Sequence, residues 1–246
     1  MPFVYLSPST QEGNYYVNGG TEEQYMNLLC DQVILYLDAS GIAYTRNDRT
    51  QSVAAAIRQA NSGNYGLYVA MHSNAAPDGQ YGSKRGIDVF YYPYSRNSRR
   101  AAELFANQLR KRYPLPQNVR TVATETLGEV ARTRAPAVLL EIGYHDNVSD
   151  ATWIKANLPA IAQAIAAGIT EYFGLPLAMP QAPQQAKVTL NFGTLNIRSR
   201  PYLGSPVLAS APNGSLLTVV GTLSGWYVVH YGSVIGYAAA NYVNLL

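Results

Sequence analysis

Two hydrophobic periodicities alternate along the chain from residue 3 to about residue 173. Residues 3–6 are apolar and predict a core strand, and residues 22–38 predict a helix whose apolar stripe is Met26, Leu29, Val33 and Leu37. Residues 137–140 form a continuous apolar run, which is typical of a strand buried on both faces. This alternation predicts an α/β fold with a mainly parallel, twisted sheet flanked by helices. A functional site is then expected beyond the carboxyl ends of the strands.

The same patterns place the other elements of this first domain. Strands are predicted at residues 42–45, 65–71 and 87–92, helices at 53–60, 97–111 and 151–173, and a short segment at 126–131. At the first helix, Thr21 and Gln24 have the spacing of a capping box, and Gly41 follows the end of the apolar stripe. Both helix boundaries therefore have a local signal.

The pattern changes after residue 174. Residues 175–186 are uncharged, include three prolines and predict a semi-extended linker. Short β runs separated by Gly, Pro, Asn and Ser follow, at residues 194–198, 216–221, 226–231 and 235–238. We therefore expect a domain at 1–174, a linker at 175–186 and a small all-β, SH3-like barrel at 187–246.

Composition limits the classes of function. Of the 246 residues, 48% are hydrophobic and 13% charged, and the net charge of +3 is too small to indicate nucleic-acid binding. No Asp or Glu follows Leu175, whereas Lys187, Arg198 and Arg200 do, so the barrel is mildly cationic. No apolar run has membrane-spanning length, and the first residues do not resemble an export signal. We expect a monomer that does not insert into membranes.

Few residues are available for catalysis. The chain has three histidines, and His72 directly follows the predicted strand 65–71, a position that structure alone could explain. Glu141 ends the most apolar strand, where packing would not favour a partly buried charge, so it predicts a functional carboxylate. Glu22 and Glu23 begin a helix, a place that acidic residues favour in any case.

Four blocks of this domain, in order, resemble the zinc-dependent N-acetylmuramoyl-L-alanine amidases (the amidase-3 type). They are TEEQYMNL at residues 21–28, MHSNA at 71–75, RGIDVFY at 85–91 and RAPAVLLEIGY at 134–144. The resemblance implies Zn²⁺ as cofactor, with Glu23 and His72 as ligands, Glu23 being placed by its spacing to Asn27. It also implies that Glu141 is the general base and that Asn74 contacts the substrate. The implied reaction is hydrolysis of the amide bond between N-acetylmuramic acid and L-alanine in peptidoglycan.

One block departs from the family pattern. The family usually has a histidine just after the first strand, whereas residues 6–14 here contain none. A subgroup that begins Ser-Pro-Ser-Thr-Gln, as residues 7–11 do, shares this opening and a block like residues 144–147. We therefore hypothesise that His145 supplies the missing metal ligand or contacts the reacting carbonyl. Glu12 is the alternative ligand, and His145 bonded only to local backbone is the structural alternative.

The C-terminal segment resembles the bacterial SH3 domains of wall enzymes. The matching blocks are LNIRSRP at residues 195–201, SGWYVV at 224–229, IGY at 235–237 and NYV at 241–243. The resemblance implies binding of a peptidoglycan peptide or cross-bridge. Trp226, Tyr227 and Tyr237 are candidates to line its groove, because aromatic rings give rigid contact area. That Trp226 is barrel core is an equal alternative.

Three interpretations of the biological role remain open. The first is a phage or prophage endolysin, made in the cytoplasm and released to the cell wall through a holin, which would explain the missing export signal. The second is a bacterial autolysin or spore-cortex hydrolase. The third is a catalytically silent wall-binding protein, which the missing histidine suggests and the set of Glu23, His72 and Glu141 opposes.

Overall fold

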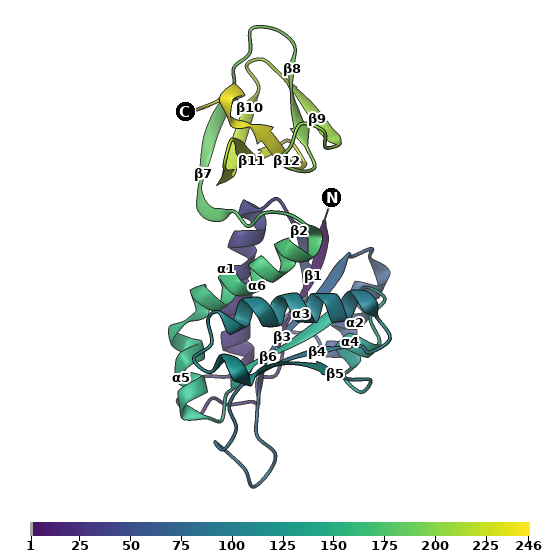
Figure 1. The fold of residues 1–246 in the computed structure, drawn as a ribbon, viewed down its shortest axis with the longest axis vertical. Helices are drawn as coiled ribbons and strands as arrows, with labels where there is room; N and C mark the ends of the chain where they lie inside the picture. Colours follow the sequence, from purple (N-terminus) through teal and green to yellow (C-terminus); the bar gives the residue numbers. More distant parts are fainter. Residues whose placement is uncertain (1) are drawn as a thin grey trace. The chain divides into compact units, whose positions relative to one another are not determined.

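The computed structural model describes residues 2–246, which form two compact units (Figure 1). One unit comprises Pro2–Ile34 and Tyr44–Phe173, and the other comprises Leu35–Ala43 and Gly174–Leu246. Within the described residues, no helix is both long and apolar enough to cross a membrane. The predicted fold classes, α/β with a mainly parallel sheet and then all-β, are confirmed.

The first unit contains a six-stranded sheet with the order β2-β1-β3-β6-β4-β5. Its strands are β1 (Phe3–Pro8), β2 (Ala43–Arg46), β3 (Leu67–Asn74), β4 (Ile87–Tyr91), β5 (Val119–Ala123) and β6 (Ala137–Tyr144). Strands β1, β3 and β6 are parallel, β4 is antiparallel to β6, and β5 is parallel to β4. The carboxyl ends of β1, β3 and β6 therefore lie at the same edge as the beginnings of β4 and β5.

Helices cover both faces of this sheet (Figure 1). They are α1 (Glu22–Ala39), α2 (Val53–Ser62), α3 (Arg96–Arg110), α4 (Gly128–Ala131), α5 (Val148–Ala156) and α6 (Leu158–Phe173). Helices α2 and α4 pack through Ala56, Ala60 and Val130 on the face that presents Tyr68 and Leu139, while α3 contacts β4, β5, β6 and α6. The caps of α1 match the prediction, since the Thr21 hydroxyl accepts from Gln24 N at 3.2 Å and Gly41 has φ +66°.

Two expectations for this unit need correction. The predicted helix 151–173 is two helices, α5 and α6, which Asn157 separates. Pro159 lacks the N–H that a continuous helix would need at this point, so a second helix begins here. Strand β5 was missed, although its β-branched residues Val119, Thr121 and Val122 favour a strand, and it pairs in parallel with β4.

The second sheet has seven antiparallel strands in the order β13-β7-β10-β11-β12-β8-β9. They are β7 (Met179–Val188), β8 (Thr194–Arg198), β9 (Val207–Pro212), β10 (Leu216–Leu223), β11 (Trp226–Tyr231), β12 (Val234–Ala239) and β13 (Val243–Leu245). Single-turn 3-10 helices occupy Pro116–Asn118 and Ala240–Tyr242.

The linker expected at 175–186 is wrong over most of its length, because residues 179–186 belong to β7. This strand pairs with both β10 and β13. The pairing of β7 with β10 shifts register between Val219 and Gly221, and Pro183 lies opposite this irregularity, where a ladder N–H is dispensable.

Candidate active site

A buried imidazole at the end of β3 lies between two carboxylates. His72 Nδ1 lies 2.8 Å from Glu22 Oε1, and His72 Nε2 lies 2.9 Å from Glu129 Oε2. All three residues are at most 5% exposed. Burial opposes charge on His72, but its bonds to Glu129 and Glu22 hold its pKa well above the usual value. The three groups thus form a carboxylate–imidazolium–carboxylate triplet.

Each carboxylate of this triplet is anchored by further polar groups. Glu129 Oε1 accepts from the hydroxyls of Ser7 at 2.7 Å and Tyr68 at 2.6 Å. Glu22 Oε2 accepts from Asn14 Nδ2 at 2.6 Å. Burial opposes ionisation of both, yet hydrogen bonds from His72 keep the pKa of Glu22 and of Glu129 below the usual value. Glu129, which sequence reasoning missed, is therefore a charged residue with a satisfied buried carboxylate.

Glu141 lies beside His72 in the sheet, as register partner across β6 and β3. Its Oε2 atom is buried and has no hydrogen-bond partner among the described residues. Burial raises the pKa of Glu141 to about 8, and the nearby carboxylates of Glu22 and Asp88 add to the effect of burial while His72 opposes it. A carboxyl group whose pKa lies this close to neutral pH can both accept and release a proton under the conditions in which an enzyme works.

This shift predicts a pH-dependent stability once any metal has been removed with a chelator. The folded protein holds the Glu141 proton up to about pH 8, whereas the usual pKa of a glutamate is near 4.5. The folded state therefore binds more protons between these values, so stability falls as pH rises through this window. His72, with its raised pKa, acts in the same direction at the upper end. Urea unfolding at about pH 6 and pH 9 measures the change in the free energy of unfolding. We expect wild type to lose more stability than Glu141→Gln between these pH values, and an equal loss in the two proteins would contradict the prediction.

The structure does not bring together the three predicted zinc ligands. The Glu23 carboxylate pairs with Arg49 at 2.6 Å and accepts from Asn27 at 3.2 Å. The neighbouring residue, Glu22, lies beside His72 in the position expected for Glu23. His145 Nδ1 lies 2.8 Å from the Ser73 carbonyl oxygen and 3.1 Å from its hydroxyl, at the end of the neighbouring strand β3. Glu12, the alternative ligand, is exposed. Within residues 2–246, no three His, Cys, Asp or Glu side chains are grouped so as to hold a metal ion.

The donor types that do converge suit zinc. Glu22 and His72 Nδ1 offer one carboxylate and one imidazole, which are ligands that Zn²⁺ takes in catalytic sites. Glu129 is hydrogen-bonded to the other ring nitrogen, His72 Nε2. Metal-binding histidines commonly have a carboxylate on the nitrogen that does not bind the metal, and this carboxylate orients the ring. Gln11, from the loop where the family histidine is missing, places its Nε2 3.3 Å from His72 Nδ1. Two ligands thus fit, and their neighbours are polar.

Comparison with family models decides the class of the first unit. A model described as N-acetylmuramoyl-L-alanine amidase matches residues 9–171. The chain belongs to this family. Amidases of this family act on peptidoglycan and are generally zinc-dependent, so the resemblance seen in the sequence is confirmed at this level. A second model, for bacterial SH3 domains, matches residues 193–244.

Solved structures of other amidases share the fold of this amidase domain. AmiC2 of Nostoc punctiforme superimposes with a TM-score of 0.62 at 19% identity, over 70% of this chain and 97% of that one. Ami1 of Mycobacterium smegmatis gives 0.61 at 20%, over 70% and 97%. The catalytic domain of the CD27L endolysin targeting Clostridia Difficile gives 0.58 at 19%, over 70% and 98%. A search of curated proteins found no match.

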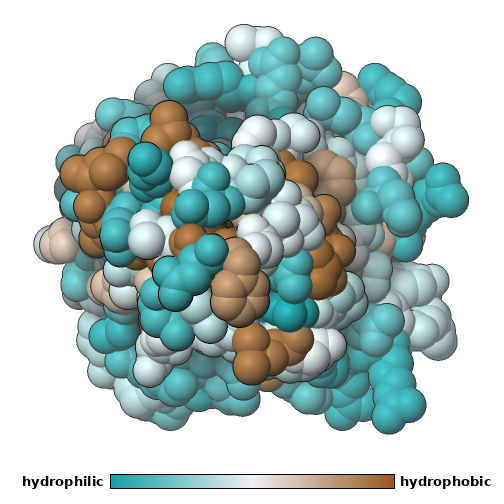
Figure 2. All heavy atoms as spheres, turned by 90° about the horizontal axis from the view of Figure 1, so that it is seen from above, coloured by the Kyte–Doolittle hydropathy of each residue, from teal (hydrophilic) through white to brown (hydrophobic). Residues whose placement is uncertain are grey.

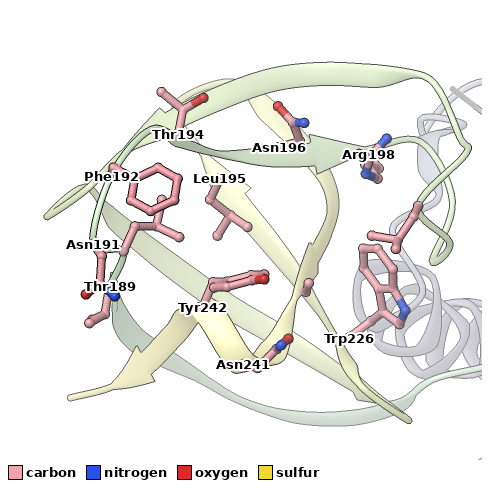
Figure 3. Close-up of a pocket in the computed structure, with 13 residues that line it drawn as sticks. Thr189, Asn191, Phe192, Thr194, Leu195, Asn196, Arg198, Trp226, Asn241 and Tyr242 are labelled. Atoms are coloured by element: carbon pink, nitrogen blue, oxygen red, sulfur yellow. The ribbon is translucent and has the colours of Figure 1, made fainter.

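The predicted substrate contacts have mixed surroundings. Asn74 is partly exposed at the end of β3, where its side-chain oxygen accepts from Ala75 N at 2.9 Å. In the barrel, Tyr237 is 1% exposed, and Tyr227 is partly buried against the hydrophobic core. Trp226 does line a cavity of about 540 Å³ (Figure 3).

The barrel cavity has aromatic and amide side chains that sequence reasoning missed. Besides Trp226, its lining includes Asn191, Phe192, Asn241 and Tyr242 (Figure 3). Phe192 is 89% exposed and Tyr242 is 44% exposed. Figure 2 shows that hydrophobic residues on the face it draws occur in separate groups among hydrophilic ones. Exposed rings beside amide groups are typical of a peptide-binding surface.

Proposed function

We propose that this amidase hydrolyses the bond between N-acetylmuramic acid and L-alanine with Glu141 as general base. The observation that carries this proposal is the Glu141 Oε2 atom, which is buried without a hydrogen-bond partner beside the Glu22–His72–Glu129 triplet. Glu141 would take a proton from the attacking water and return it to the departing amine. The test is to incubate the protein with purified peptidoglycan and measure new alanine amino termini.

Zinc dependence is the second part of the proposal. Glu22 and His72 would hold the ion, and Glu129 would keep the His72 proton on Nε2 so that Nδ1 is free to bind. When bound, zinc lowers the pKa of water to about 7 and polarises a carbonyl. The family membership and the donor types at Glu22 and His72 support this assignment.

Metal content distinguishes Glu22 from Glu23, the ligand expected from spacing. We expect Glu22→Ala and His72→Ala to lower bound zinc strongly, while Glu23→Ala keeps it, because Glu23 pairs with Arg49. Elemental analysis of purified variants measures this, with circular dichroism to show that each folds. His145→Ala tests the remaining hypothesis for a third ligand. Loss of zinc in Glu23→Ala but not in Glu22→Ala would show that Glu23 is the ligand, as the spacing to Asn27 predicts.

The barrel is proposed to bind wall peptide through the cavity at Trp226. We expect Phe192→Ala to weaken binding to purified walls about tenfold, because an exposed ring can be removed with little effect on folding. Leu216→Ala, also exposed but outside the cavity, is the matched control. Co-sedimentation with walls measures both, and equal binding by the two variants would refute the assignment.

An endolysin role, acting on the bacterial wall after holin-dependent release, remains our proposal for the biological setting. It is supported by the fold shared with an endolysin catalytic domain together with the SH3 family match. A bacterial autolysin or spore-cortex hydrolase is the alternative. A silent wall-binding protein would release no alanine amino termini in the test above.

A further inference from the structure

A row of polar side chains crosses four strands of the amidase sheet. His72 on β3, Glu141 on β6, Asp88 on β4 and Arg120 on β5 are successive register partners. Partners on neighbouring strands present their side chains on the same face, so these residues share one face of the sheet. Two strand spacings, about 10 Å, separate the backbones of Glu141 and Arg120. The proposed general base, Glu141, and the positively charged Arg120 therefore lie in one row on the same face of the sheet.

A cavity of about 540 Å³ lies at the cationic end of this row. Its lining is Ser83, Lys84, Arg85, Leu115, Gln117, Asn118, Arg120 and Tyr144. Among these described residues three are basic and none is acidic. Tyr144 is three residues after Glu141, at the end of β6, so the cavity is close to the proposed active site. Its lining suits an anion of modest size.

Buried carboxylates fix both arginines of this cavity. Arg85 Nε donates to Asp150 at 2.9 Å, and Asp150, 0% exposed, also accepts from Tyr113 at 2.7 Å. Arg120 donates to Asp88 through Nε at 2.8 Å and Nη2 at 2.9 Å. A guanidinium has five N–H donors, so each ion pair engages only part of the group. The remaining donors are held in place before any ligand arrives.

We propose that this cavity binds the free α-carboxylate of the residue that follows L-alanine in the stem peptide. The inference rests on the proposed amidase function. That residue is a γ-linked glutamate, whose α-carboxylate is either free or amidated. In an extended peptide this carboxylate lies two residues from the scissile carbonyl, about 7 Å. This distance is of the same order as the separation of about 10 Å between the backbones of Glu141 and Arg120.

The consequence is a preference between two wall chemistries. A carboxylate gains charge-assisted hydrogen bonds from Lys84, Arg85 and Arg120, and a carboxamide does not. We expect kcat/KM for muramoyl-L-alanyl-D-isoglutamate to exceed that for the isoglutamine analogue by about 10-fold or more. Lys84 is exposed and its replacement leaves the buried ion pairs intact, so Lys84→Glu isolates the charge of the cavity.

The experiment compares wild type, Lys84→Glu and the control Lys111→Glu, an exposed lysine outside the cavity, on both substrates. We expect Lys84→Glu to lose the preference, measured as the ratio of kcat/KM for the two substrates, and Lys111→Glu to keep the wild-type ratio. A wild type that cleaves both substrates equally, or a preference that survives in Lys84→Glu, overturns the inference.

Calorimetric binding of the dipeptides L-alanyl-D-isoglutamate and L-alanyl-D-isoglutamine separates this inference from the proposed function. If neither muramoyl substrate is cleaved, the proposed function fails, and the dipeptides still test the cavity. Tighter binding of the acid than of the amide, lost in Lys84→Glu, supports the site. Equal or absent binding of the two dipeptides refutes it.

Discussion

Glu141→Gln is expected to lower kcat on purified peptidoglycan by between about 10² and 10⁴-fold, the usual contribution of a general base. Glutamine keeps the size of the side chain but cannot accept the proton of the attacking water. The buried Oε2 atom has no hydrogen-bond partner among the described residues, so the substitution breaks no side-chain bond at that atom. Release of alanine amino termini measures the effect.

The control is Glu125→Gln, an exposed glutamate on the loop before α4. Its activity should match that of wild type. At about pH 6, where the folded wild type holds the Glu141 proton, zinc content and the unfolding midpoint should be the same in Glu141→Gln and wild type, which would assign the loss to proton transfer. A Glu141→Gln variant with more than a tenth of wild-type kcat would exclude the assigned role.

Glu129→Ala is expected to have the largest effect on stability, about 3–5 kcal/mol, the cost of removing one partner from a buried charged pair. The change leaves the Ser7 and Tyr68 hydroxyls and His72 Nε2 without their common acceptor. Urea unfolding measures the loss. Glu125→Ala should change stability by less than about 0.5 kcal/mol, as exposed substitutions usually do.

Glu129→Gln separates positioning from folding, since it keeps the volume and one acceptor oxygen. We expect it to fold but to bind zinc about 10- to 100-fold more weakly, as loss of a carboxylate behind a metal-bound histidine usually does. Competition with a chelator gives that affinity. If Glu129→Gln binds zinc as tightly as wild type, Glu129 supports the fold only.

Local signals were enough to predict most of the amidase domain. The apolar stripe of α1 and the continuous run of β6 predicted those elements, and the order of β3 and β6 placed His72 and Glu141 at one edge. Failures occurred where tertiary contacts decide. Pairing with β10 and β13 makes a strand of a proline-containing stretch, β7, that by itself predicts a linker.

Within the site, too, tertiary contacts that the sequence pattern does not show decide between Glu22 and Glu23. Consecutive residues of a helix point about 100° apart, so spacing to Asn27 cannot tell which carboxylate faces His72. The loop before α1 decides, because Asn14 accepts from Glu22 N at 2.8 Å and donates to its side chain. Glu129 had only a weak signal, an acidic residue between Leu127 and Val130, and α4 is too short for its periodicity to be seen.

Because β4 runs antiparallel to β6, the proposed catalytic residues and the proposed substrate cavity come from different segments of the chain. Reactive groups come from the carboxyl ends of β3 and β6, whereas the cavity proposed for the substrate peptide is built largely from segments that precede β4 and β5. Loops tolerate changes in sequence and length better than the strands that they join. Residues 75–86 and 111–118 are thus the segments to exchange between amidases when altered stem-peptide selectivity is wanted with the hydrolytic centre unchanged.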